Sequence, residues 1–149
     1  KLLCRTGALP TMNTVGREVK PRKWPRPARI CPACDSTEVE DVEHFVMQCP
    51  LYRAQRQVLI SDATAALARS TGSVDGAAFG ALPPRAKLLV LLGRRVGDPV
   101  AENRIDRSMK RFLRKAWNRR APYTEIVNQV LNTEYAVFIN GIIKSNRAR

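Results

Sequence analysis

Apolar residues recur at three- and four-residue steps over much of the chain, which is the spacing of one face of an α-helix. One such pattern begins at Pro50, a residue well suited to the first turn of a helix, and continues to Ser70. Two more patterns follow over residues 100–120 and 123–143. The sequence therefore predicts a mainly α-helical region over residues 50–149.

Two shorter segments separate the first two of these helices. Residues 71–82 are rich in Gly, Ser and Ala, so we expect a loop there. Pro83 and Pro84 then precede a short apolar segment, Ala86 to Leu92, which is followed by Gly93. We predict that this segment is a buried helix that ends at the glycine.

The N-terminal part of the chain has a different pattern. A short helix is expected over residues 1–8, stopped by Gly7 and Pro10. From Thr11 to Arg29, three prolines are interspersed with basic residues. Because proline removes a backbone donor and restricts the residue before it, we expect this stretch to be extended. Residues 1–30 are thus predicted to form a basic, proline-rich arm after a short helix.

Three of the four cysteines and the single histidine lie between the arm and the helical region. The order is Cys31-Pro32-Ala33-Cys34, nine residues, His44, four residues and Cys49. This spacing is typical of a Cys3His zinc site, in which four ligands complete a tetrahedron and leave no position for water. We therefore predict that residues 31–49 form a zinc knuckle with one structural Zn2+. Disulfides and buried free thiols are the alternatives, and Cys4 is expected to be a core residue.

The ligand spacing also predicts local structure. His44 and Cys49 are five residues apart, which is a poor match to one face of an α-helix. A short helix over Val42 to Met47 should therefore end before Cys49. If Cys49 caps the helix that starts at Pro50, the positive helix end favours its thiolate.

Charge changes sign along the chain, whose formal net charge is +13. Residues 1–30 contain eight basic and one acidic residue, residues 31–62 contain two and six, and residues 99–121 contain eight and two. Two basic blocks of this kind attract polyanions, most commonly nucleic acid and less often an anionic membrane surface. A role in solubility alone is the alternative.

The charges within the knuckle are all negative, in contrast to the segments on either side. They belong to Asp35, Glu38, Glu40, Asp41 and Glu43. Three thiolates on one Zn2+ would add about one further negative charge. The knuckle is therefore expected to repel phosphate and to act mechanically, by fixing the arm relative to the helix after Pro50.

The arm is the first candidate for nucleic-acid binding. Its candidate residues are Arg17, Lys20, Arg22, Lys23, Trp24, Arg26 and Arg29. An aromatic ring between cations on an extended backbone is suited to stacking on an unpaired base while the cations hold phosphates. Packing of Trp24 against the knuckle is an equally good interpretation.

The second candidate is the helix predicted over residues 100–120, which we call the Arg-rich helix. Steps of about 100° per residue place six cations on one side, namely Arg104, Arg107, Lys110, Arg111, Arg114 and Lys115. The opposite side carries Ile105, Met109, Phe112, Leu113, Ala116 and Trp117. We expect the apolar side to pack on the domain and the cations to contact phosphates, with an ordinary solvated face as the alternative. The last predicted helix, over residues 125–143, is expected to be core or a surface for a partner helix.

Several motifs together resemble a known family. They are Arg5-Thr6-Gly7 before the basic arm, Cys31-Pro32-Ala33-Cys34, Glu43-His44-Phe45, Gln48-Cys49-Pro50-Leu51-Tyr52 and Arg56. Over roughly residues 2–60 the chain resembles the C-terminal zinc-knuckle region of non-LTR (LINE-type) retrotransposon reverse transcriptases. The resemblance implies that Cys31, Cys34, His44 and Cys49 coordinate zinc. It also implies that this module helps to engage template RNA or target DNA alongside the rest of the parent polypeptide, an RNA-directed DNA polymerase.

The sequence itself contains no set of catalytic residues. It has no Tyr/Phe-x-Asp-Asp signature, and its sole histidine is assigned to zinc. Since phosphoryl transfer needs metal-binding carboxylates on a rigid scaffold, we expect the chain to be non-catalytic by itself and to have no small-molecule substrate.

Location and partners follow from the same features. No apolar run approaches the roughly 18 residues of a membrane span, and the start has neither an initiator Met nor a signal peptide. We therefore expect a soluble piece of a longer chain, nuclear or cytoplasmic, in a retroelement ribonucleoprotein. The alternatives are a retroelement-derived structural subunit of a large ribonucleoprotein, such as an organellar ribosome, and a protein-interaction zinc module.

Overall fold

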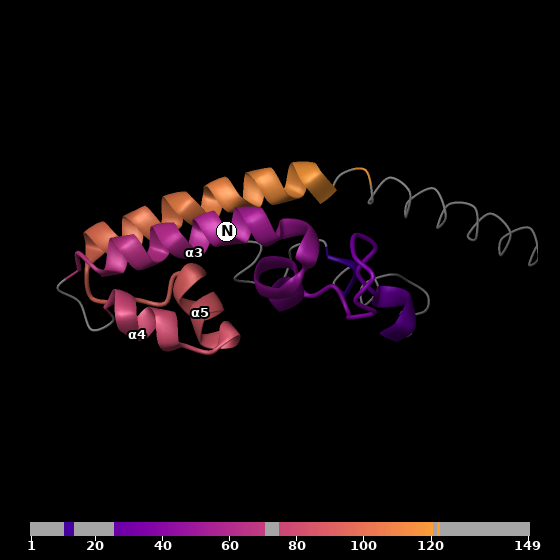
Figure 1. Cartoon of the computed structure of the whole chain (residues 1–149), viewed down its shortest axis with the longest axis horizontal. Helices are drawn as coiled ribbons and strands as arrows, with labels where there is room; N and C mark the ends of the chain where they lie inside the picture. Colours follow the sequence, from indigo (N-terminus) through magenta and orange to yellow (C-terminus); the bar gives the residue numbers. More distant parts are fainter. Residues whose placement is uncertain (1–10, 14–25, 71–74, 121, 123–149) are drawn as a thin grey trace, which may run out of the picture.

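The computed structural model describes residues 11–13, 26–70, 75–120 and 122. Most of these residues are helical, and none of them lies in a β-strand (Figure 1). The mainly α fold predicted from the sequence is therefore confirmed for this part of the chain. The elements are the 3-10 turn η1 (Arg26–Arg29), the π-helical turn η2 (His44–Gln48), the 3-10 turn η3 (Pro50–Tyr52) and the helices α3 (Arg53–Leu67), α4 (Gly76–Ala81) and α5 (Pro84–Leu91). The Arg-rich helix follows over residues 99–120.

Two long helices, α3 and the Arg-rich helix, run side by side in opposite directions (Figure 1). A hydrogen bond of 2.7 Å from Ser108 Oγ to Asp62 Oδ2 joins them. The helix predicted from Pro50 to Ser70 is thus confirmed, although its first turn is the 3-10 turn η3. The face of α3 that is buried carries Leu59, Ala63, Ala66 and Leu67.

The loop predicted over residues 71–82 is wrong, because α4 lies within it. Asp75 begins the helix, and its carboxylate accepts a hydrogen bond of 2.7 Å from the Ala78 N–H. Gly76 lies so close to α3 that an added Cβ would be 2.9 Å from the carbonyl oxygen of Thr64. The small residues that suggested a loop therefore allow two helices to pack closely.

The helix predicted over Ala86 to Leu92 is confirmed as α5. Its end is also as predicted, since Gly93 has a φ of 106° and donates a hydrogen bond of 3.0 Å to the Val90 carbonyl. Asp98 precedes the Arg-rich helix and caps it, since its carboxylate accepts a hydrogen bond of 2.8 Å from the Val100 N–H.

The prediction of an extended arm is wrong where the structure describes it. Arg26–Arg29 forms η1, in which Pro27 falls in the first turn, where a missing N–H costs no intrahelical bond. Met12 and Asn13 are also helical. The other predictions for this region and the C-terminus lie outside the described residues: the helices over residues 1–8 and 123–143, the arm residues 14–25, and Cys4.

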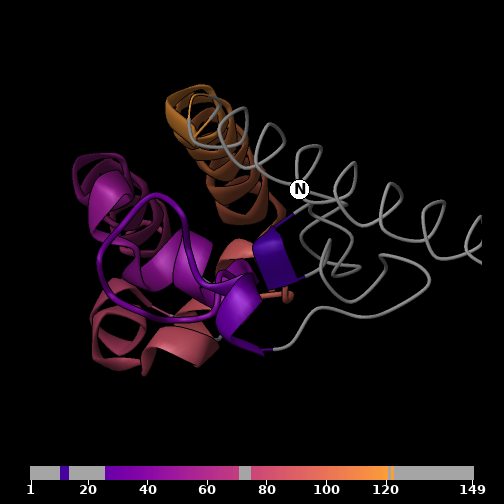
Figure 2. The same ribbon diagram turned by 90° about the vertical axis from the view of Figure 1, so that its right-hand side faces the viewer.

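One continuous core joins residues 31–52 to the helices. Phe45 packs against Tyr52, Phe112 and Trp117, with ring centroids 4.8, 6.2 and 6.1 Å away. This contact places residues 31–52 against the ends of α3 and the Arg-rich helix, as the view from that end shows (Figure 2). None of the described helices combines the length and the apolar composition that a membrane span requires.

Candidate metal centre

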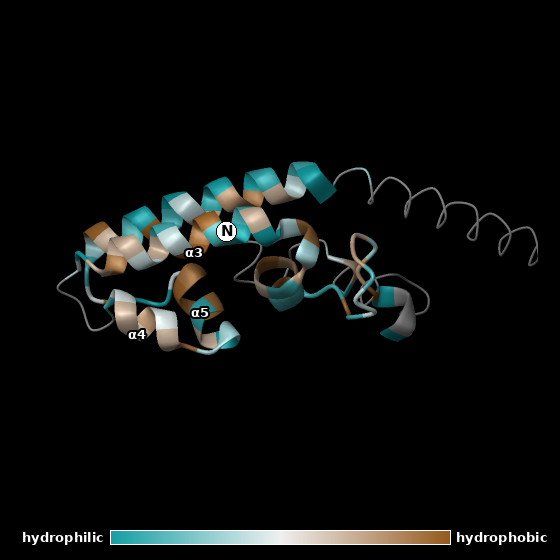
Figure 3. Ribbon diagram, viewed as in Figure 1, coloured by the Kyte–Doolittle hydropathy of each residue, from teal (hydrophilic) through white to brown (hydrophobic). Residues whose placement is uncertain are grey.

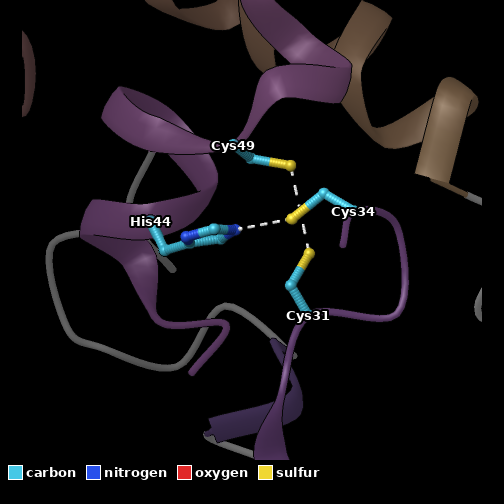
Figure 4. A group of neighbouring side chains, drawn as sticks. All are labelled: Cys31, Cys34, His44 and Cys49. Atoms are coloured by element: carbon cyan, nitrogen blue, oxygen red, sulfur yellow. Dashed lines mark hydrogen bonds between the residues drawn. The ribbon is translucent and has the colours of Figure 1, made fainter. Parts of the chain in front are cut away.

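Cys31 and Cys34 lie on a tight turn that is held at its base by backbone pairing. Ile30 and Val39 form an isolated antiparallel bridge, and the Cys31 N–H donates to the Glu38 carbonyl at 2.9 Å. The two-residue gap between the cysteines lets both sulfurs point toward the same centre (Figure 4).

His44 and Cys49 flank the other half of the centre, at the start of η2 and just after its end. Asp41 precedes this turn, and its Oδ1 accepts a hydrogen bond of 2.8 Å from the His44 N–H. The Cys49 N–H donates to the His44 carbonyl at 2.7 Å, which is the five-residue bond of a π-turn. The prediction that the helix ends before Cys49 is confirmed. The π-turn also explains how a five-residue spacing brings both side chains to one site.

The four side chains, which we call the Cys/His cluster, converge in space (Figure 4). Their ligand atoms all lie within 4.8 Å of one another. Cys31 Sγ is 3.9 Å from Cys49 Sγ, and Cys34 Sγ is 3.4 Å from His44 Nε2. A tetrahedral zinc site has S–S edges of about 3.8 Å and S–N edges of about 3.5 Å, given Zn–S near 2.3 Å and Zn–N near 2.0 Å. The cluster can therefore hold one metal ion.

The disulfide alternative is not found among the described cysteines. Cys31, Cys34 and Cys49 are free, and the 3.9 Å between two of their sulfurs is far beyond the roughly 2.0 Å of a disulfide bond. Cys31, His44 and Cys49 are at most 3% exposed, whereas Cys34 is half-buried. Four donors that are this close and mostly withdrawn from water suit a structural ion rather than a site open to substrate.

The donor groups change one another's protonation. The pKa of Cys49 is lowered to about 4, chiefly because the Cys31 thiol donates a hydrogen bond to its sulfur, and the same bond raises the pKa of Cys31. The Cys49 side chain makes no capping hydrogen bond at the start of η3, although the nearby Leu51 N–H lowers the pKa of Cys49 further, in the predicted direction. Burial lowers the pKa of His44, but hydrogen bonds to Cys49 and Cys34 outweigh it and the net shift is upward.

Neighbouring groups hold the ligands in position. The Ser36 hydroxyl is 3.1 Å from Cys34 Sγ. Arg56 Nη1 donates a hydrogen bond of 3.0 Å to the carbonyl of Cys49, which fixes the backbone at the last ligand. The sequence places Arg56 only in the motifs of the family resemblance, and the structure shows its contact with the backbone of Cys49.

The five acidic side chains of residues 31–49 were expected together to repel phosphate, but Glu40 does not reach the surface. This side chain is fully buried, and its two oxygens accept hydrogen bonds of 2.7 Å from Arg120 Nε and Nη2. Its Oε2 also accepts a hydrogen bond of 2.7 Å from the Met12 N–H. The charge of Glu40 is therefore neutralised inside the protein, whereas Asp35, Glu38 and Asp41 are exposed.

The Arg-rich helix has the two faces that the sequence predicts. Ile105, Met109, Phe112 and Ala116 are buried, while Leu113 and Trp117 are half-buried. All six cations of the predicted stripe are exposed, and the outward side of the helix is largely hydrophilic (Figure 3). Two of the six form ion pairs, Lys110 with Asp106 at 2.7 Å and Arg111 with Asp62 at 3.4 Å. Within the described residues, no salt bridge involves Arg104, Arg107, Arg114 or Lys115.

The two candidate arm residues that the structure describes, Arg26 and Arg29, differ in their exposure to solvent. Arg26 is exposed, but Arg29 is half-buried and its Nη1 donates a hydrogen bond of 2.9 Å to Asn13 Oδ1. Arg29 therefore has a structural contact in addition to its predicted role. The other candidates, Arg17, Lys20, Arg22, Lys23 and Trp24, lie outside the described residues.

Arg69, which follows α3 and lies beside the cationic stripe, was not among the residues predicted to bind nucleic acid. It lines a groove together with Arg104, Arg107 and Arg111 of the Arg-rich helix. No sequence signal identifies this position, because it meets the other arginines only once the two helices pack together.

Comparisons of the chain with protein-family models, with curated proteins and with solved structures gave no match.

Proposed function

We propose that this chain is a zinc-stabilised, nucleic-acid-binding module in which the Cys/His cluster orders the fold and the Arg-rich helix holds backbone phosphates. The observation that carries this proposal is the combination of a closed, buried donor set at one end of the molecule with an exposed row of cations along one helix.

The donor chemistry supports zinc at the Cys/His cluster. Three sulfurs and one imidazole nitrogen suit Zn2+ better than the hard cations Mg2+ and Ca2+, which prefer oxygen. Four protein ligands would leave no open position for a reacting water. Zinc at this site would join the turn of Cys31 and Cys34 to η2 and to the start of α3, and its role would be structural.

The charge distribution supports nucleic acid as the partner. The cations of the Arg-rich helix are exposed on the side opposite its packed face, and only two of the six are neutralised by acidic neighbours within the described residues. A row of cations along about three helical turns can neutralise several phosphates at once. Three exposed acidic residues, Asp35, Glu38 and Asp41, lie instead near the Cys/His cluster, as expected for a part that does not touch phosphate.

The family resemblance supports a more specific role. As in the C-terminal region of non-LTR retrotransposon reverse transcriptases, this module would engage template RNA or target DNA while the polymerase activity resides elsewhere in the parent protein. The chain itself would then bind nucleic acid without catalysing a reaction.

The test is a salt titration of binding to RNA and to duplex DNA, with wild-type protein and a triple variant, R107E/R114E/K115E. We expect affinity to fall steeply with salt, and the triple variant to bind about tenfold or more weakly with a salt slope reduced by roughly 2. The matched control is R85E/R94E/R95E, which makes the same change in net charge at exposed positions on and after α5. Equal losses in both variants would mean that only net charge matters and would contradict the assignment to the Arg-rich helix.

A further inference from the structure

We propose that the seam between α3 and the Arg-rich helix binds a single nucleic-acid strand, with phosphates in an arginine groove and a base in an adjoining apolar pocket. This inference rests on the proposed function. It adds that the bound nucleic acid is single-stranded, and it names the site where the strand binds.

The arginine groove is the more cationic half of the seam. It has a volume of about 270 Å3, and its charged lining residues are Arg69, Arg104, Arg107, Arg111 and Asp62. The single carboxylate already accepts hydrogen bonds from Ser108 and Arg111, at 2.7 and 3.4 Å. Four guanidinium groups therefore face one carboxylate that already has partners. Planar guanidinium forks bind phosphate oxygens in pairs, so the groove matches a phosphodiester backbone.

The apolar pocket continues the same seam. It has a volume of about 200 Å3 and shares Ser108 and Arg111 with the arginine groove. Its apolar lining comes from Ala54, Val58, Leu59 and Phe112, and Lys115 stands beside them. Val58 is 52% exposed, so this apolar surface is open to solvent. A cationic groove that leads directly into an apolar pocket fits an occupant that is charged along its backbone and apolar at its side groups.

A base of a single strand meets this description better than a base in a duplex. Its flat faces are apolar, and one that is not paired can leave the stack at little cost. Gln55 also lines the pocket, and its Oε1 is buried with no hydrogen-bond partner in the described part of the chain. An amino group on the edge of an entering base would supply a donor. A duplex would reach only the arginine groove unless a base flipped out.

The test compares an ordinary single strand with a single strand of the same length that carries abasic sites, both as RNA and as DNA, together with a duplex. The protein is the zinc-loaded full chain, and binding is measured by fluorescence anisotropy at one salt concentration. We expect the ordinary strand to bind on the order of tenfold more tightly than the abasic strand. We also expect the single strand to bind more tightly than the duplex. Comparing the RNA and DNA strands shows which of the two nucleic acids the protein prefers.

The pocket variant is Val58→Ser, with Leu89→Ser as its control at another exposed apolar position, on α5. Val58→Ser should weaken binding of the ordinary strand while leaving the abasic strand unchanged, and Leu89→Ser should change neither. Equal affinity for the ordinary and the abasic strand, with binding still dependent on salt, would overturn the inference. So would a Val58→Ser variant that binds the abasic strand more weakly than wild type does. If the protein bound none of the probes, the proposed function would be overturned as well.

Discussion

At the scale of single residues, the most consequential contact outside the Cys/His cluster is the buried ion pair between Glu40 and Arg120. Both oxygens of the carboxylate are used, and the guanidinium also lies 5.0 Å from the ring centroid of Trp117. The Met12 N–H adds a third hydrogen bond to the carboxylate. One side chain thus joins residues next to the cluster, the end of the Arg-rich helix and the segment at residues 11–13.

Replacing Glu40 with Gln should destabilise the protein by about 3 kcal/mol, because Arg120 would keep its charge in a buried position without a counterion. Urea unfolding with zinc in excess measures this change without loss of the metal. The control is Glu38→Gln, at an exposed position, which should change the free energy of unfolding by less than about 0.5 kcal/mol. An equally small change for Glu40→Gln would show that the pair does not stabilise the fold.

The metal donors could be predicted from the sequence, but the role of Glu40 could not. Cys31, Cys34, His44 and Cys49 lie within one short segment whose spacing is itself the signal. Glu40 and Arg120 are 80 residues apart, and each resembles its exposed acidic or basic neighbours along the chain. Only the packing of the Arg-rich helix against residues 31–52 identifies them as partners.

At the scale of elements, the close packing of α4 on α3 depends on the absence of a side chain at Gly76. An added Cβ there would lie 2.9 Å from the Thr64 carbonyl oxygen and 3.2 Å from Ala68 Cβ. Gly80, on the same helix, has open space around an added Cβ. Adding a side chain at these two glycines should therefore change stability in opposite directions, although both lie in one short helix.

Gly76→Ala should destabilise the protein by about 1–3 kcal/mol, since backbone atoms must move to admit the methyl group. Gly80→Ala should instead stabilise it by about 0.5–1 kcal/mol, because alanine loses less backbone entropy in a helix. Thermal and urea unfolding of both variants check the two signs. Stabilisation by both substitutions would mean that α4 does not pack on α3 as described.

The helices that were predicted well are those whose apolar spacing is long enough to define a face, such as α3 and the Arg-rich helix. The error at α4 has a physical reason. Gly and Ala favour loops when they are judged by local sequence, but here they provide the small surface that close helix packing requires. The 3-10 turn at Arg26–Arg29 differs from the predicted extended arm because a proline in the first turn of a helix interrupts no intrahelical hydrogen bond.

At the scale of the whole molecule, one core joins the Cys/His cluster to the Arg-rich helix. The Cys/His cluster lies beside Phe45, and Phe45 packs on Phe112 and Trp117 of the Arg-rich helix. Zinc would therefore stabilise the position of the Arg-rich helix without contacting nucleic acid. Loss of the metal should weaken binding indirectly, by releasing this helix from its support.

The most direct test of this account is the zinc content of the purified full chain, measured by elemental analysis together with its circular dichroism before and after chelation. We predict one zinc per chain and a loss of cooperative folding when a strong chelator removes it, with recovery on addition of Zn2+. Substituting Cys49→Ser should abolish the stoichiometric zinc. A chain that holds no metal and folds normally in chelator would contradict the central claim that zinc organises this fold.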